Sequence, residues 1–307
     1  MRTRWLLGLS FLATCSTSDS HAMVVYVPGT SWIADTWQHY FYLPYSPTGM
    51  PSHATGIPDD VVRRVELRAA SGGSGSDSSS STSCRSFDIE QVIGGADTGS
   101  VLWSGSVLLA EHIRSQGIAA GSTVIELGTG LGLVSIVASC LGASVVASDG
   151  DAAILPLVQR NILRNLDSSH GAIDVRQLWW GDQGAARALG SFDLILGADL
   201  VYGSDSVVGP AAREASFAKL LCTMWLLSND ETTLVLAYRE RKVVERLFFS
   251  KLWERFEPAV VREEVTQLAG SSGVQVYTFR RRRGVLRPGA EGVEQAPSPL
   301  PYCVDGM

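Results

Sequence analysis

The feature that most constrains the fold is an alternation of short apolar strands with helix-length segments along the middle of the chain. Strands are expected at 123–127, 143–148, 173–178, 192–198 and 232–238. Helices are expected between and after them, at 131–141, 151–165, 211–227 and 241–256. Such alternation is typical of βαβ units, which form a parallel sheet with helices on both faces. The pattern therefore predicts an α/β fold.

A final pair of strands, expected at 260–268 and 273–280, is joined by Ala-Gly-Ser-Ser, which is a hairpin signal. The sheet is therefore expected to be mostly parallel with an antiparallel edge hairpin. Open sheets of this kind bind ligands beyond the carboxyl ends of their strands, where the strand order reverses. Residues that directly follow the strands are the first candidates for a functional site.

Composition narrows the class of protein. Apolar residues make up 45% of the 307 residues, which is enough for a sizeable core and excludes a wholly disordered chain. The 25 basic and 31 acidic residues give a net charge of −6, so no nucleic-acid partner is expected. The five cysteines are scattered, without a C-x-x-C pair or histidines at ligand spacing. We therefore expect mostly reduced cysteines, no disulfide framework and no metal site.

The ends of the chain differ from its middle. Residues 1–22 run from arginines through a short apolar stretch to small polar residues, which is the order of a targeting leader. The alternative is a disordered extension. The apolar stretch is shorter than the roughly 20 residues that span a bilayer, so no stable membrane insertion is expected. Residues 284–307 predict a disordered tail, and the four arginines at 280–283 predict a solvated strand end, with anion binding as the alternative.

Residues 23–86 form an N-terminal extension whose Ser/Gly-rich segment, 71–83, is expected to be a flexible loop. Alternating residues at 61–67 and 87–93 flank this loop and predict two strands. We favour a hairpin with an inserted loop over a separate small module. The main domain is expected to span 87–283.

A glycine-rich turn, Glu126-Leu-Gly-Thr-Gly-Leu-Gly132, includes the end of the first strand of the alternation. Glycine permits positive φ and close approach of a ligand to the backbone. The N–H groups at the start of the next helix can bind a carboxylate or a phosphate. Asp149 stands 17 residues beyond Gly132, at the end of the second strand, where its carboxylate can bind a ribose diol. The two features predict an adenosine-type cofactor, whereas glycines serving only a tight turn are the alternative.

The spacing of the glycines distinguishes two cofactors. A dinucleotide fingerprint requires G-x-G-x-x-G, and Leu133 stands here at the position of its third glycine. Glu126 would repel a pyrophosphate but would favour the cationic methionine end of S-adenosylmethionine. We therefore expect S-adenosylmethionine, with a nucleotide-binding oxidoreductase as an alternative.

The fourth strand of the alternation ends in Ala198-Asp-Leu-Val-Tyr202, which places a carboxylate and a phenol at its carboxyl end. We interpret Asp199 as a functional residue beside the cofactor, with capping of the next turn as the alternative. Trp180 follows the third strand and is either a wall against adenine or an ordinary core residue.

The set of motifs resembles the methyltransferase-like family of non-histone protein lysine methyltransferases, over roughly residues 87–283. The resemblance is carried by 98–106, which includes Trp103, and by 126–134, Asp149, Trp180-Gly181, 196–202, 237–241, 248–249 and 274–277. It implies a Rossmann-like seven-strand methyltransferase sheet. One departure lies at the entrance of the pocket, where the family usually has an acid after the tryptophan and this chain has Ser104.

The resemblance also implies roles for individual residues. Besides Glu126, the cofactor would contact Trp103, Gly128, Thr129, Gly130, Asp149, Trp180 and Ala198. The substrate lysine would meet two catalytic residues, Asp199, which orients the amine, and Tyr202, which narrows the channel.

The function expected from the sequence is methyl transfer from S-adenosylmethionine to a lysine of a non-histone protein. The resemblance suggests a chaperone or a translation factor as the type of substrate. A small-molecule methyltransferase on the same scaffold is the alternative. We expect a monomer in the cytoplasm, or a protein of an organelle or the secretory pathway if residues 1–22 are a targeting signal.

Overall fold

The computed structural model describes residues 14–17, 20–23, 60–67, 86–92, 98–202, 209–241, 243–262, 273–282 and 303. Strands β1 (Thr14–Thr17) and β2 (Ser20–Met23) pair antiparallel. They lie in a unit separate from the one that holds all the other helices and strands. The predicted loop at 71–83 and the predicted tail at 284–302 and 304–307 lie outside the described residues.

The second unit is built on a seven-stranded sheet with the order β10-β11-β9-β8-β5-β6-β7. Five strands run parallel: β5 (Thr123–Leu127), β6 (Ser144–Asp149), β7 (Ile173–Gln177), β8 (Leu194–Ala198) and β9 (Thr233–Tyr238). The strand order reverses at β5, because the chain moves outward from β5 to β7 and then returns to β8 on its other side. The prediction of a mostly parallel α/β sheet is confirmed.

The edge hairpin is confirmed, but its details differ from the prediction. Strand β11 (Gln275–Arg281) runs antiparallel to β9, and β10 (Phe256–Arg262) runs antiparallel to β11. The outermost strand is therefore parallel to the other five. Strand β10 begins at Phe256, four residues before the predicted start at 260, because the aromatic Phe256 is buried in the core. The predicted helix at 241–256 is correspondingly too long.

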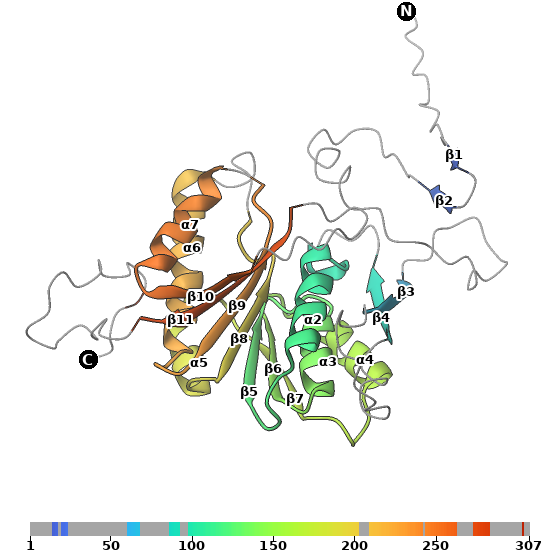
Figure 1. Cartoon of the computed structure of the whole chain (residues 1–307), viewed down its shortest axis with the longest axis horizontal. Coiled ribbons are helices and arrows are strands. Elements are labelled where there is room, and N and C mark those ends of the chain that lie inside the picture. Colours follow the sequence, from blue (N-terminus) through green and yellow to red (C-terminus); the bar gives the residue numbers. More distant parts are fainter. Residues whose placement is uncertain are drawn as a thin grey trace, which may run out of the picture. The chain divides into compact units, whose positions relative to one another are not determined.

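Helices cover both faces of the sheet (Figure 1). Helices α2 (Ser104–Gln116), α3 (Leu133–Cys140) and α4 (Leu155–Asn165) lie on one face. Helices α5 (Gln183–Leu189), α6 (Pro210–Leu226) and α7 (Arg246–Trp253) lie on the other. The short 3₁₀ turns η1 (Thr98–Ser100) and η2 (Val243–Glu245) precede α2 and α7. The core between the sheet and α5–α7 is aromatic, with Phe248, Phe256 and Phe279 at most 1% exposed.

A second, two-stranded sheet confirms the predicted pairing around the Ser/Gly-rich segment. Strand β3 (Asp60–Glu66) pairs antiparallel with β4 (Ser86–Val92), and Val65 lies opposite Phe87. The two strands therefore form a hairpin, which is the arrangement that we favoured. The domain boundaries stay predictions.

Strand β4 is attached to α4 by two asparagines one helical turn apart. The amide of Asn161 accepts from the backbone N–H of Glu90 (2.7 Å) and donates to its carbonyl (3.0 Å). Asn165 makes the same pair of bonds with the backbone of Asp88 (2.8 and 3.0 Å). The side chains thus hydrogen-bond β4 as a neighbouring strand would. Asn161 also donates to the carbonyl of Leu131 in the glycine-rich turn (3.0 Å).

The arginines near the end of the hairpin bind the protein itself. The guanidinium of Arg281 lies 3.5 Å above the ring of Trp225 and donates to the carbonyl of Ser228 (2.5 Å). Arg282 donates to the carbonyl of Trp253 (2.8 Å). These two arginines therefore stabilise the packing of the hairpin against α6 and α7, which corrects the expectation of a solvated run. Arg280 is exposed, and Arg283 lies outside the described residues.

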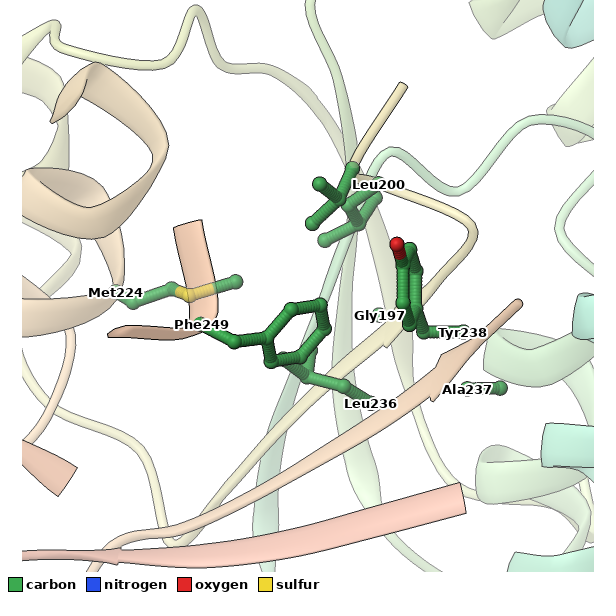
Figure 2. Close-up of a pocket in the computed structure, with 8 residues that line it drawn as sticks. Gly197, Leu200, Met224, Leu236, Ala237, Tyr238 and Phe249 are labelled. Carbon is green, nitrogen blue, oxygen red and sulfur yellow. The ribbon is translucent and has the colours of Figure 1, made fainter. Parts of the chain in front are cut away.

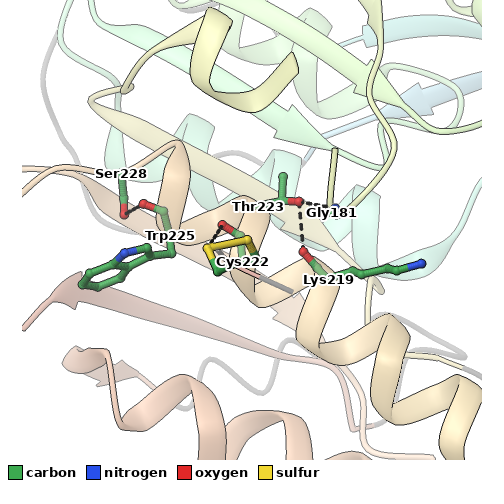
Figure 3. The surroundings of a disulfide bond; sticks show 7 residues. Gly181, Lys219, Cys222, Thr223, Trp225 and Ser228 are labelled. Carbon is green, nitrogen blue, oxygen red and sulfur yellow. Dashed lines mark hydrogen bonds between the residues drawn. A yellow bond between two sulfur atoms is a disulfide. The ribbon is translucent and has the colours of Figure 1, made fainter. Parts of the chain in front are cut away.

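Helix α6 carries a disulfide that the sequence analysis did not predict. Cys222 is joined to Cys303, with the two Cα atoms 5.4 Å apart (Figure 3). The neighbouring Thr223 hydroxyl accepts from the N–H of Gly181 (2.9 Å) and donates to the carbonyl of Lys219 (3.0 Å). This contact attaches the turn after Trp180 to α6. Cys140 is also disulfide-bonded, so at least three of the five cysteines are oxidised and the expectation of mostly reduced cysteines is wrong.

The role of Asn161 predicts a large loss of stability on truncation. The Asn161→Ala variant leaves three buried backbone groups of Glu90 and Leu131 unpaired, each at about 1–3 kcal/mol, so we expect a loss of at least about 3 kcal/mol in urea unfolding. Leu163→Ala on the same helix is the matched control, because Leu163 is 80% exposed and its truncation should change stability by at most about 0.5 kcal/mol. Equal stability of the two variants would show that Asn161 does not attach β4.

Candidate active site

The candidate site lies at the carboxyl ends of β5, β6 and β8, where the strand order reverses. Strand β5 leads into the glycine-rich turn 128–132, β6 ends at Asp149, and Asp199 directly follows β8. Because β5 pairs in parallel with both β6 and β8, the three ends meet at one edge of the sheet. The structure therefore brings together the acidic residues and the glycines that the sequence analysis selected.

The glycine-rich turn needs its glycines. Gly128, Gly130 and Gly132 have φ values of 60°, 52° and 85°, which side-chain-bearing residues rarely adopt. A Cβ at Gly128 would lie 2.7 Å from the Cδ2 atom of Leu200. Gly132 immediately precedes α3, so the turn delivers the chain to a helix N-terminus. The site thus has open backbone and a helix start that can approach a ligand closely.

Glu126 organises this turn from within the sheet. Its side chain is buried, and its Oε2 atom accepts from the Thr129 hydroxyl (2.7 Å), the Ser135 N–H (2.9 Å) and the Ser135 hydroxyl (2.5 Å). Burial raises the pKa of Glu126 to about 7, although these hydrogen bonds oppose the shift. Its contacts are with the turn and with α3. Glu126 is therefore placed to shape the cofactor site through Thr129 and Ser135.

Asp149 fits the role of a ribose ligand. Its Oδ2 atom accepts from the N–H of Gly130 (3.1 Å) and its Oδ1 atom accepts from the N–H of Asp151 (3.0 Å). A carboxylate offers about four acceptor positions, so both oxygens can accept one more hydrogen bond. Partial burial raises the pKa of Asp149, and the two N–H groups lower it. The carboxylate is thus held in place with capacity left for a diol.

The segment that contains Trp103 lies over the glycine-rich turn. A Cβ at Gly130 would lie 3.4 Å from the carbonyl oxygen of Gly99, so the two backbones are in close contact. Strand β4 holds this segment, because the Gln91 side chain accepts from the N–H of Leu102 (3.2 Å). Trp103 immediately precedes α2. The hairpin therefore positions the segment that ends at Trp103 beside the glycine-rich turn.

Two adjacent tryptophans line different parts of the edge. Trp180 lies near Gly128, and its ring meets the ring of Tyr202 edge-on at 6.4 Å between centroids. Trp179 is 62% exposed, and its ring would lie 3.2 Å from a Cβ at Gly150, the residue after Asp149. Trp179, which was not selected from the sequence, is therefore the tryptophan beside Asp149, the predicted ribose ligand. Trp180 lies on the side of Asp199 and Tyr202.

Asp199 has a constrained backbone and a buried side chain. Among the described residues, Asp199 is the one non-glycine residue with a positive φ, which is 54°. Its N–H donates to the carbonyl of Ala237 on β9 (2.8 Å). The carboxylate lies against Gly105 of α2, where a Cβ would come within 2.3 Å of Oδ2. Strain of this kind persists where the surroundings enforce it, and it is common at functional sites. Gly105, which follows Ser104 at the start of α2, thus leaves room for the carboxylate of Asp199.

The two oxygens of Asp199 differ. Oδ1 accepts from the guanidinium of Arg241 at 2.7 Å, and the two side chains are 8% and 22% exposed. Oδ2 is buried and has no hydrogen-bond partner among the described residues. An unpaired buried carboxylate oxygen is costly, so it marks a position where a ligand can donate a hydrogen bond. Ala198 is the last residue of β8 and immediately precedes Asp199.

Tyr202 lies at the rim of the site. Its side chain is 54% exposed and contacts Trp180. Partial burial and the charge of Asp149 raise the pKa of its phenol, so Tyr202 is protonated at neutral pH and can donate a hydrogen bond. Asp199 and Tyr202 therefore leave the same strand end but contact different neighbours, α2 and Trp180 respectively.

The residue between them anchors the turn in the core. Leu200 is 6% exposed and fills the space left by Gly128 and Gly197, where an added Cβ would lie 2.7 and 2.4 Å from its methyl carbons. Figure 2 shows Leu200 facing a small apolar recess lined also by Tyr238, Phe249 and Met224. Since Leu200 is adjacent to Asp199, its packing holds the carboxylate at the sheet edge.

The comparison with known families decides the class of protein. A family model described as lysine methyltransferase matches residues 83–255, which is more than half of the chain. This chain belongs to the lysine methyltransferase family. It is an S-adenosylmethionine-dependent methyltransferase, and the oxidoreductase alternative is therefore wrong.

Two relatives and one solved structure illustrate the similarity. Protein N-lysine methyltransferase METTL21A of Danio rerio is 35% identical over 158 residues, which are 51% of this chain and 67% of that protein. The protein of the same name in Mus musculus is 33% identical over 184 residues, or 59% and 77% of the two chains. Ribosomal protein L11 methylase from Lactobacillus delbrueckii subsp. bulgaricus aligns with a TM-score of 0.44 and 16% identity, covering 59% of this chain and 81% of that one.

The geometry of this family member fits its cofactor. The ribose diol could bind the remaining acceptor positions of Asp149, and the open turn at 128–130 leaves room for the methionine part. Among the described residues, no group of three potential metal ligands is close enough to bind an ion, and no helix is long and apolar enough to cross a membrane. The individual contacts of the site residues with the cofactor stay predictions.

The packing of Leu200 predicts the effect of a methyl group at Gly128. In Gly128→Ala the added methyl group displaces Leu200 and strains a positive φ, which costs about 1–3 kcal/mol. The affinity for S-adenosylmethionine, measured by calorimetry, should therefore fall by about tenfold or more. Gly190→Ala is the matched control, because Gly190 also has a positive φ (75°) but would meet no atom within 4 Å. Unchanged affinity of Gly128→Ala would contradict the assigned role of the turn.

The pKa of Glu126 predicts how stability depends on pH. Because folding raises the pKa from the ordinary value of 4.5 to about 7, the folded protein binds more protons than the unfolded chain between these pH values. The stability contributed by protonated Glu126 is therefore present below about pH 4.5 and is lost as pH rises through about 7. Relative to Glu126→Gln, wild type should lose about 2–3 kcal/mol between pH 5 and pH 7.5 in urea unfolding. Parallel stability curves for the two proteins would exclude this titration.

Proposed function

We propose that this enzyme transfers a methyl group from S-adenosylmethionine to the side-chain amine of a lysine in a non-histone protein. The observation that carries the proposal is the buried Oδ2 atom of Asp199, which has no hydrogen-bond partner among the described residues and lies against Gly105 of α2, on the residue that directly follows β8. A lysine amine is a donor of matching charge and shape for this oxygen. The relatives named above are protein N-lysine methyltransferases.

The reaction is an in-line displacement. When bound, the cofactor supplies a methyl group on a sulfonium; a nitrogen–carbon bond forms as the carbon–sulfur bond breaks, and its electron pair goes to sulfur. The amine must first lose a proton to water, because the lysine pKa is about 10.4 and only the neutral amine attacks. Catalysis is therefore mainly alignment and desolvation.

The residues divide this work. Asp199 accepts a hydrogen bond from the amine and orients its lone pair toward the methyl group. It also stabilises the positive charge that develops on nitrogen. Tyr202, protonated at neutral pH, narrows the lysine channel and donates or accepts one hydrogen bond. Neither residue acts as a strong general base.

The proposal extends to the setting of the enzyme. A protein substrate fits the half-exposed Tyr202 at the rim, since a lysine side chain can reach a site at the sheet edge. A folded chaperone or translation factor in the cytoplasm is the type of substrate that we propose, acted on by a monomer. The identity of the substrate is left to the experiment below.

The test is transfer of labelled methyl groups in a cell lysate. Wild type is expected to label discrete proteins on lysine, identified by mass spectrometry, whereas Asp199→Asn should lower the rate by about 10²-fold through lost alignment while still binding S-adenosylmethionine. Asp174→Asn is the matched control, because Asp174 is exposed on β7 and pairs with exposed Arg176. Its activity should equal that of wild type.

The outcomes separate the alternatives. Label on a protein residue other than lysine would contradict the proposed acceptor. Label only in small molecules would also contradict it and would favour the small-molecule alternative. If Asp199→Asn loses cofactor binding to the same extent as turnover, the proposed division of roles is wrong. In that division other residues bind the cofactor, and Asp199 orients the amine.

A further inference from the structure

An ion pair at the acceptor site is not used by the mechanism above. Arg241 reaches Asp199 from the segment after β9, and its Nη2 atom lies 2.7 Å from Oδ1. Helix α2 faces the same carboxylate with Gly105, which has no side chain. Among the described residues, the charged group that pairs with Asp199 is Arg241, and the pair is largely removed from water.

A buried network fixes Arg241. Glu245 is 1% exposed, and its Oε2 atom accepts from the backbone N–H of Arg241 (3.0 Å) and from the Tyr238 hydroxyl (2.6 Å). Since Tyr238 is the last residue of β9, these two bonds tie the segment of Arg241 to the sheet. The guanidinium is thus held at a fixed position relative to Asp199.

The charge of the pair matters for the reaction. A lone buried carboxylate stabilises an ammonium ion beside it and raises the pKa of the amine, which opposes loss of the proton. A guanidinium on the other oxygen offsets this effect, because it repels the same ammonium ion. The paired carboxylate can still accept a hydrogen bond at Oδ2.

We propose that Arg241 is a positioning residue that holds Asp199 and offsets its negative charge, so that a lysine amine meets an ion pair rather than a lone carboxylate and releases its proton to water. This inference rests on the proposed function. It predicts that replacing Arg241 strengthens the binding of an ammonium ion. The same replacement is expected to impair catalysis. A residue with a merely structural role would weaken binding when replaced.

The test is calorimetric binding of n-butylammonium, which is a lysine side chain without its backbone, at pH 7.5 to the full chain saturated with S-adenosylhomocysteine. Arg241→Gln is expected to bind it at least about threefold more tightly than wild type, because Asp199 loses its cationic partner. Arg241→Lys keeps the charge and should bind as wild type does, whereas Asp199→Asn should bind more weakly. Arg246→Gln is the matched control, because Arg246 pairs with Glu240 at the surface and its loss should leave binding unchanged.

The outcomes distinguish this inference from the proposed function. Unchanged or weaker binding by Arg241→Gln, with normal binding by wild type, would overturn the role of Arg241 alone. Arg241→Lys provides a second test, which remains available when the glutamine variant folds poorly. Because this variant keeps the charge, binding that is tighter than that of wild type by as much as expected for Arg241→Gln would also overturn the role of Arg241. No binding of n-butylammonium by wild type would overturn the proposed acceptor site itself, and this inference with it.

Discussion

The reversal of strand order at β5 is the constraint on which the rest of the site depends. It brings the ends of β5, β6 and β8 to one edge, which is where open sheets of this kind bind ligands. Glu126, the acid inside β5, then shapes the turn at this edge through Thr129 and Ser135. A buried carboxylate with three donors on one oxygen is costly to move, so the turn is held rigidly in front of α3.

The site is assembled from large side chains placed against glycines. Asp199 lies against Gly105, Leu200 against Gly128 and Gly197, and Trp179 against Gly150. In each pair the missing Cβ allows a functional or anchoring side chain to reach the sheet edge. The hairpin β3–β4 contributes from outside the sheet, because Asn161 and Asn165 attach it to α4 and Gln91 then holds the segment of Trp103. Cofactor side and acceptor side are therefore supported by different parts of the fold.

Much of this could be predicted from local patterns in the sequence. The parallel strands, the turn at 126–132 and the positions of Asp149 and Asp199 follow from apolar runs that end in glycine or acid. What could not be predicted depends on contacts between distant residues. Arg241 is 42 residues from Asp199, and nothing local distinguishes it from the other arginines of its segment. The asparagines of α4 and the Cys222–Cys303 pair were missed for the same reason. Helix α2 was missed because its first three residues, Ser-Gly-Ser, are poor helix formers and hide the apolar face that follows.

Cofactor and lysine amine are proposed to meet at the edge formed by the ends of β5, β6 and β8. The most direct test is a crystal structure of the full chain with S-adenosylhomocysteine and n-butylamine bound. The account predicts the ribose hydroxyls on the carboxylate of Asp149 and the amine nitrogen within hydrogen-bonding distance of Oδ2 of Asp199, on the side that faces the cofactor sulfur. An amine bound away from Asp199, or a ribose bound away from Asp149, would contradict it.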